Sequence, residues 1–157
     1  MNEIFLMKLG EVVLKGANKR QFENKLRQNV RRRMKAYGNF DVYIMQSTVY
    51  VEALTDNEDI DAAFEVCKKV FGVISLTRAA ACEKNKEAIA KLAIEYLKDD
   101  MESAKSFKVE SKRSDKAFPM TSIQLSQYVG GELAEAYPDT VVDVHEPELT
   151  VHIEVRD

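Results

Sequence analysis

Basic side chains gather in two short segments of this 157-residue chain, and each segment runs directly into a predicted helix. The first is Lys15-Gly16-Ala17-Asn18-Lys19-Arg20, and the second is KRSDKAFPMTS at 112–122. The first N–H groups of a helix have no partner within it, and the helix dipole favours an anion at that end. The candidate phosphate ligands are therefore Lys15, Lys19 and Arg20 in the first segment, and Lys112, Arg113 and Lys116 in the second.

An aromatic residue accompanies the second basic segment. Phe118 is placed either to stack on a base or to pack beneath the loop. Each segment taken alone is compatible with an ordinary solvated charged surface. Two segments of the same kind, however, predict a protein that follows a polynucleotide backbone through several phosphates.

The charge of the chain is unevenly distributed, although its net value is −3. Residues 1–38 carry ten Lys or Arg against three Asp or Glu, whereas residues 132–157 carry eight acids and one Arg. The net charge alone argues against a nucleic-acid partner, but local basic patches on an acidic body do not.

Catalytic signatures are missing from the sequence. It contains no G-x-x-x-x-G-K-[ST] loop, G-x-G-x-x-G, G-x-S-x-G or H-E-x-x-H motif. His145 and His152 fall on different predicted strands without further ligands, so we expect no metal site. Cys67 and Cys82 have no Cys or His partner at a suitable spacing and are interpreted as free, inert thiols.

The same features bear on location. No apolar run approaches the roughly 20 residues that span a bilayer, and the first residues, which include Glu3, do not form a secretion signal. Sparse cysteines suit a reducing compartment. We therefore expect a cytoplasmic protein without a membrane partner.

The elements that position the basic segments follow from hydrophobic periodicity. Residues 1–82 predict the order strand, helix, strand, strand, helix, strand: EIFLMKL, a helix from Asn18 to Gly38, the hairpin FDVYIMQ and TVYVEAL, a helix near 60–71, and GVISLTRAAAC. This is the ferredoxin-like βαββαβ pattern, with both helices on one face of an antiparallel sheet. On the first helix, a projection places Arg20, Arg27, Arg31 and Lys35 on the solvent side.

Residues 83–157 predict a second α/β domain, which makes the whole chain α+β. A long helix from Asn85 to about Met101 is followed by the strand SFKVESKR, a loop, and a helix that Thr121 and Gln124 cap. Gly130 and Gly131 inside that helix suggest close packing. TVVDVHE and ELTVHIEVR predict two further strands around Pro147.

Three segments resemble a known family. GEVVLKGANKRQFENKL (10–26) is similar to the N-terminal ferredoxin-like signature of tRNA 4-thiouridine sulfurtransferases, and this resemblance implies a part in thiamine biosynthesis for the full-length protein as well. FKVESKRSDKAFPMTSIQLSQYVGGEL (107–133) and VVDVHEPELTVHIEVR (141–156) resemble the THUMP domain that follows it in this family. The resemblance covers most of the chain, in the same order.

The resemblance implies that the chain binds the acceptor and 3′ end of tRNA and presents it to a catalytic domain for uridine thiolation. That domain, with its S-G-G-x-D-S loop and active-site cysteine, is not in this sequence, and the last THUMP strand is expected to be missing too. ATP with Mg²⁺ and a sulfur-donating cysteine desulfurase are implied for the full-length protein only. The implied RNA contacts are Lys15, Asn18, Lys19, Arg20, Lys112, Arg113, Lys116, Phe118 and Pro119, to which the charge pattern adds Arg27 and Arg31.

Other functions remain open at this point. The acidic segment 132–157 is compatible with a protein-interaction module that contacts a catalytic subunit or a second copy as a homodimer. The chain also fits a fragment of another THUMP-containing RNA-modifying enzyme. Asn18 and Arg20 at a phosphate loop would suit a small acylphosphatase-like enzyme.

Overall fold

The computed structural model describes residues 2–9, 19–45, 48–70 and 73–157. The chain consists of two compact units, Met1–Ala81 and Cys82–Asp157. This division falls one residue before the boundary predicted from the sequence. Each unit has its own hydrophobic core and is described by itself.

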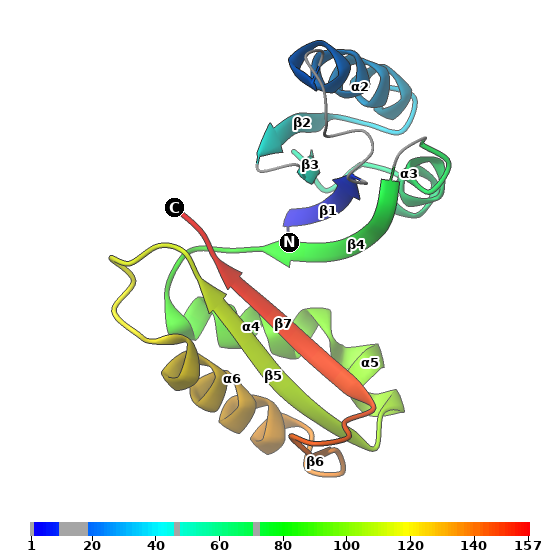
Figure 1. The fold of residues 1–157 in the computed structure, drawn as a ribbon. Coiled ribbons are helices and arrows are strands. Elements are labelled where there is room, and N and C mark those ends of the chain that lie inside the picture. Colours follow the sequence, from blue (N-terminus) through cyan, green and yellow to red (C-terminus); the bar gives the residue numbers. More distant parts are fainter. Residues whose placement is uncertain (1, 10–18, 46–47, 71–72) are drawn as a thin grey trace. The chain divides into compact units, whose positions relative to one another are not determined.

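The first unit has the ferredoxin-like order of elements (Figure 1). Its elements are β1 (Asn2–Leu9), α2 (Lys19–Met34), β2 (Phe40–Met45), β3 (Thr48–Ala53), α3 (Ile60–Cys67) and β4 (Val73–Ala81). The sheet order is β2-β3-β1-β4, and every neighbouring pair is antiparallel. The predicted fold class is confirmed for this unit.

The core of this unit follows from strand alternation and helix periodicity. Phe5, Met7 and Leu9 occupy alternate positions of β1 and are buried, while Phe5 and Met7 pair in register with Val51 and Val49 of β3. Leu26, Val30 and Met34 recur every four residues along α2 and cover the same face. The predicted apolar stripe of this helix is therefore confirmed.

The first helix ends earlier than predicted. It stops at Met34, and the amide of Tyr37 donates to the Met34 carbonyl (2.9 Å) in a closing turn. Gly38 follows with φ +140°, a backbone conformation that residues with a side chain rarely adopt. The glycine therefore marks the turn after the helix.

Replacing Gly38 with alanine is expected to destabilise the first unit. A Cβ at this position would lie 2.9 Å from the Cα of Glu58, so the backbone would have to shift. Together with the strained φ, this predicts a loss of about 1–3 kcal/mol in the free energy of unfolding. Urea denaturation of G38A and the parent chain measures it, with Gly131→Ala as the control because no atom lies within 4 Å of a Cβ there. A G38A chain as stable as the parent would contradict this prediction.

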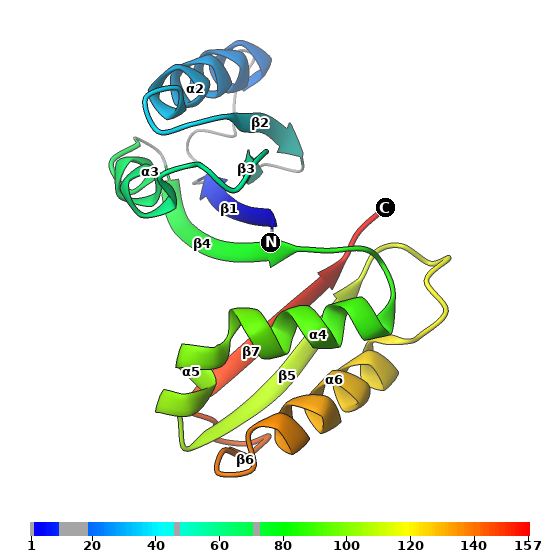
Figure 2. The ribbon, with the colours of Figure 1, turned by 180° about the vertical axis from the view of Figure 1, so that it is seen from behind.

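The second unit is a three-stranded sheet with helices on one face (Figure 2). Its elements are α4 (Lys86–Tyr96), α5 (Lys98–Ser103), β5 (Ser106–Arg113), α6 (Ser122–Ala136), β6 (Val141–Val142) and β7 (Leu149–Val155). The sheet order is β6-β5-β7, and both outer strands run parallel to β5. The strands predicted at 140–146 and 148–156 thus lie on either side of β5.

Helix α6 begins where the sequence predicts, after Thr121. The Thr121 hydroxyl accepts from the Gln124 amide (3.1 Å), and the Gln124 side chain accepts from the Thr121 amide (3.0 Å). This is the reciprocal capping box that the sequence predicts. Leu125, Val129 and Leu133 of α6 are buried against Phe107 and Val151 of the sheet.

Two predicted elements of this unit are shorter than expected. The helix predicted to Met101 breaks at Leu97, and a separate helix, α5, carries Met101 into the core. The strand predicted at 140–146 has only two residues, because the Asp143 carboxylate accepts from the amides of His145 (3.0 Å) and Glu146 (3.1 Å) and turns the chain. These backbone hydrogen bonds also lower the pKa of Asp143.

The close packing predicted around the two glycines of α6 is wrong. A Cβ on Gly130 would make only ordinary contact with Val109 (3.7 Å), and nothing lies within 4 Å at Gly131. In the parts of the chain that the structure describes, no helix combines the length and the apolar character that a membrane span requires.

Candidate nucleic-acid interface

The second basic segment lies at one end of the second unit. There β5 and β7 reach their carboxyl ends and α4 and α6 begin, while the yellow loop 114–121 runs from β5 to α6 (Figures 1 and 2). In open parallel sheets, ligands bind at the carboxyl ends of the strands. The amino ends of α4 and α6 also direct their positive dipole ends to this place, which favours an anion.

Arg113 holds the loop from within. It is the last residue of β5, and its Nη1 donates to the carbonyl oxygens of Phe118 (3.1 Å) and Met120 (3.2 Å). Arg113 is half-buried, and its guanidinium group is occupied by hydrogen bonds to the loop that follows it in the predicted basic segment. We therefore assign Arg113 to the architecture of the loop rather than to its exposed cationic surface.

The amino end of the loop is fixed to β7. The amides of Ser114 (2.9 Å) and Asp115 (3.3 Å) both donate to the Val155 carbonyl, and the Ser114 hydroxyl donates to the same oxygen (3.2 Å). Asp115 then accepts the Ala117 amide (3.0 Å) on one carboxylate oxygen and the Lys84 ammonium group (2.8 Å) on the other. The hydrogen bond from Lys84, followed by that from the Ala117 amide, lowers the pKa of Asp115.

Phe118 does not face solvent. It is 5% exposed and belongs to the core of the second unit, beneath the loop. Of the two placements predicted for this residue, the structure shows packing beneath the loop and not stacking on a base, because a buried ring offers no face to a base. Of the predicted residues in this segment, Lys112, Lys116 and Pro119 are exposed.

The first basic segment is described only in part. Lys15 and Asn18 lie outside the described residues. Lys19 and Arg20 are exposed in the first turn of α2, where Lys19 lies 3.9 Å from Glu23. An exposed pair at this spacing contributes little to stability and leaves the cation accessible.

The row of arginines along α2 does not lie wholly on the solvent side. Arg27 is half-buried, and its Nε is buried without a hydrogen-bond partner in the described part of the chain. Arg31 donates from Nη2 to the Val42 carbonyl of β2 (3.4 Å). The projection was wrong for Arg27, whereas Arg31 is exposed as predicted although it also reaches the edge strand β2, which lies along α2.

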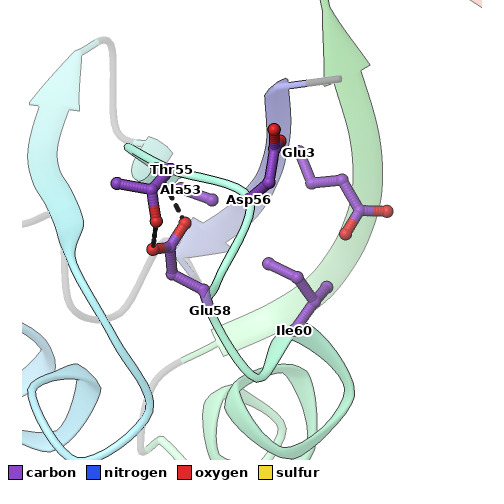
Figure 3. Close-up of a pocket in the computed structure, with 6 residues that line it drawn as sticks. All are labelled: Glu3, Ala53, Thr55, Asp56, Glu58 and Ile60. Atoms are coloured by element: carbon purple, nitrogen blue, oxygen red, sulfur yellow. Dashed lines mark hydrogen bonds between the residues drawn. The ribbon is translucent and has the colours of Figure 1, made fainter.

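A concave site in the first unit has the opposite charge (Figure 3). It is lined by Glu3, Ala53, Thr55, Asp56, Glu58 and Ile60. Glu58 accepts hydrogen bonds from the amide and the hydroxyl of Thr55, and Glu3 pairs with Arg78 (3.1 Å). Three carboxylates repel phosphate, so this hollow is not part of a nucleic-acid interface.

The thiols and imidazoles form no reactive cluster. Burial raises the pKa of Cys67 to about 11, and burial together with Glu83 raises that of the exposed Cys82. Both shifts disfavour a nucleophilic thiolate. His152 is exposed on β7 with Nδ1 3.8 Å from Glu110, whereas His145, predicted on a strand, lies in the turn after Asp143. Across the described ranges, no group of three or more His, Cys, Asp or Glu is arranged to hold a metal ion.

Sequence reasoning missed two cations at this end of the unit. Lys84 precedes α4 and contacts Asp115, and Lys86 begins α4 with its Nζ 5.0 Å from the centre of the Tyr128 ring on α6. Neither contact has a local signal, because the partners lie 31 and 42 residues further along the chain.

The two units match two described families. Residues 4–77 match the ThiI ferredoxin-like domain, and residues 83–157 match the THUMP domain. The chain is a ThiI ferredoxin-like domain followed by a THUMP domain. The resemblance drawn from the sequence is therefore confirmed for both.

Related proteins align with this chain over its whole length. It is 39% identical over 160 residues to a probable tRNA sulfurtransferase of Alkaliphilus oremlandii and 35% identical over 159 residues to one of Acetivibrio thermocellus. These matches cover the whole of this chain. They cover only 40% and 41% of the two relatives, so the chain spans about two fifths of their length.

A solved structure has the same arrangement of folds. A 4-thiouridine synthetase in complex with RNA and bound ATP aligns with a TM-score of 0.82 and 22% identity, over 99% of this chain and 39% of that one. At this identity the match supports the fold of the ThiI ferredoxin-like and THUMP domains, and nothing finer.

Proposed function

We propose that this chain binds tRNA at its acceptor and 3′ end, as the RNA-binding region of a tRNA 4-thiouridine sulfurtransferase. The observation that carries the proposal is the loop 114–121 of the THUMP domain. Its backbone is fixed by Arg113 and Asp115, and it leaves Lys112 and Lys116 exposed at the end of the sheet where two helices begin. Exposed cations at the end of a sheet where two helices begin suit phosphate groups.

The mode of recognition follows from the residues available. Lysines and helix amino ends contact phosphates and set the register of the RNA, but they do not read bases. Pro119 is exposed beside them and is available to an unpaired nucleotide. Lys19 and Arg20 of the ferredoxin-like domain supply a second set of phosphate contacts. We infer selectivity for the form of tRNA and its single-stranded 3′ end more than for sequence.

The remaining parts of the proposal concern the longer protein. The relatives are named tRNA sulfurtransferases, and we propose that thiolation with ATP and Mg²⁺ belongs to a catalytic domain outside these 157 residues. The sequence has no S-G-G-x-D-S loop, so ATP binding is not assigned to it. A cytoplasmic location, a homodimer and a cysteine desulfurase as sulfur donor complete the proposal.

The test is a binding titration of the chain with tRNA across a salt series from about 50 to about 300 mM. The logarithm of affinity is expected to fall linearly with that of salt concentration, with a slope of several units if several phosphates are contacted. Removal of the four 3′-terminal nucleotides is expected to weaken binding about tenfold or more. Weak binding that is indifferent to salt and to the 3′ end would overturn the proposal.

A second candidate function is a protein-interaction module. The acidic segment 132–157 carries three exposed valines, Val141, Val142 and Val144, and β6 is an edge strand of the sheet. Exposed apolar side chains on an edge favour a protein contact. This candidate predicts the salt-insensitive result in the titration above, which separates it from tRNA binding.

A further inference from the structure

The basic loop of the THUMP domain contains one acid at an unfavourable place. Asp115 lies between Arg113 and Lys116, within the segment that the proposed function assigns to phosphate binding. An unpaired carboxylate there would repel RNA and offset one of the two exposed lysines. The structure must therefore either turn this charge away or neutralise it.

Lys84 provides the neutralising charge from outside the loop. Its Nζ donates to the Asp115 carboxylate (2.8 Å) and to the Arg156 carbonyl (2.9 Å). The other oxygen of Asp115 is occupied by the Ala117 amide (3.0 Å). Lys84 thus links three segments: the start of α4, the loop, and the residue after β7.

The contacts of Lys84 indicate that it acts on the site by binding Asp115 rather than by contacting RNA itself. Lys84 is itself exposed, but two acceptors within the protein, the Asp115 carboxylate and the Arg156 carbonyl, engage its ammonium group. Asp115 in turn makes the turn that continues to Phe118, whose amide donates to the Asp115 carbonyl (3.2 Å). Loss of Lys84 would leave the carboxylate without a compensating charge and would remove one of the contacts that hold the loop.

We propose that Lys84 is a positioning residue of the tRNA site, which neutralises Asp115 and ties the loop to the end of β7 so that Lys112 and Lys116 meet the phosphates without a competing carboxylate. This inference rests on the proposed function. It adds a residue that lies outside the basic segment and that contacts its partner 31 residues away.

The test uses Lys84→Met, which keeps most of the length of the side chain and removes its charge. The tRNA affinity of K84M is expected to fall about three- to fivefold at about 100 mM salt, with the slope of the salt dependence unchanged because no phosphate contact is lost. Lys98→Met on α5 is the matched control, because it removes an exposed lysine at the other end of the unit (Figure 1) and is expected to change affinity less than about twofold.

A double variant separates neutralisation from direct contact. In K84M/D115N the uncompensated carboxylate is gone, while the side-chain oxygen that remains at position 115 still accepts the Ala117 amide, so affinity is expected to return to within about twofold of the parent. If Lys84 touched RNA directly, the slope of K84M would fall by about 0.7–0.9 and D115N would not rescue it. That result would overturn the proposal.

Amide hydrogen exchange supplies a readout without RNA. The Ala117 and Ser114 amides are expected to exchange severalfold faster in K84M than in the parent, while the melting temperature changes by less than about 4 °C because the lysine of the pair is about half exposed. Unchanged exchange would overturn the proposal for Lys84 even if tRNA binds. Absence of binding by the parent chain would instead overturn the proposed function, so the two failures are distinguishable.

Discussion

Replacing both Lys112 and Lys116 with methionine is expected to lower the affinity for tRNA about 30- to 100-fold at about 100 mM salt. Both side chains are exposed at the carboxyl end of β5, beside a loop whose backbone the protein itself holds. A hydrogen bond to a charged group contributes about 1.5–3 kcal/mol, and solvent-exposed charges lie at or below the lower end of that range, so each lysine that contacts a phosphate is worth up to about tenfold. Electrophoretic mobility shift or fluorescence titration measures the loss.

The salt dependence makes this prediction specific. Each lysine that neutralises a phosphate contributes about 0.7–0.9 to the slope of log affinity against log salt, so the double variant is expected to lose about 1.4–1.8. The control is Lys91→Met/Lys98→Met on α4 and α5, which removes the same charge from exposed positions outside the loop. Equal losses in the two double variants would show that only net charge matters, and would contradict a site at the loop.

Features set by neighbours in sequence were predicted well. The capping box of Thr121 and Gln124 spans three residues, and the apolar stripe of Leu26, Val30 and Met34 needs only the helical period, so both follow from the sequence. The alternation in β1 likewise fixes which side chains face the helices. The ferredoxin-like order then follows from the succession of such elements.

Features set by distant partners were not predictable in the same way. The contact between Arg31 and β2 depends on a strand that lies beside α2 only after folding, so a projection of the helix alone could not find it. The role of Arg113 depends on carbonyl groups that the loop turns toward it. Lys84 has no signal near Asp115 at all, because tertiary structure alone brings them together. The clustering of basic residues in the sequence therefore indicated where the candidate interface lies, but not which of these residues are exposed and which hold the structure.

Phe118→Ala is expected to destabilise the THUMP domain by about 3–5 kcal/mol. The ring is 5% exposed and packs in the core that Phe107, Leu125 and Val155 share, so truncation removes apolar contacts and leaves a cavity. Chemical denaturation measures the change, and hydrogen exchange of α6 assigns it to this domain. Because the Phe118 carbonyl also accepts from Arg113, the loop should lose order together with the core.

A conservative variant distinguishes a core residue from a stacking residue. Phe118→Leu keeps most of the apolar volume and is expected to cost less than about 1.5 kcal/mol of stability, with tRNA affinity within about twofold of the parent. A ring that stacked on a base would behave in the opposite way: F118L would retain full stability and lose the stacking energy of about 1–3 kcal/mol, which is about five- to 150-fold in affinity. Burial predicts the first pattern, because the same side chain cannot both fill the core beneath the loop and present its face to RNA.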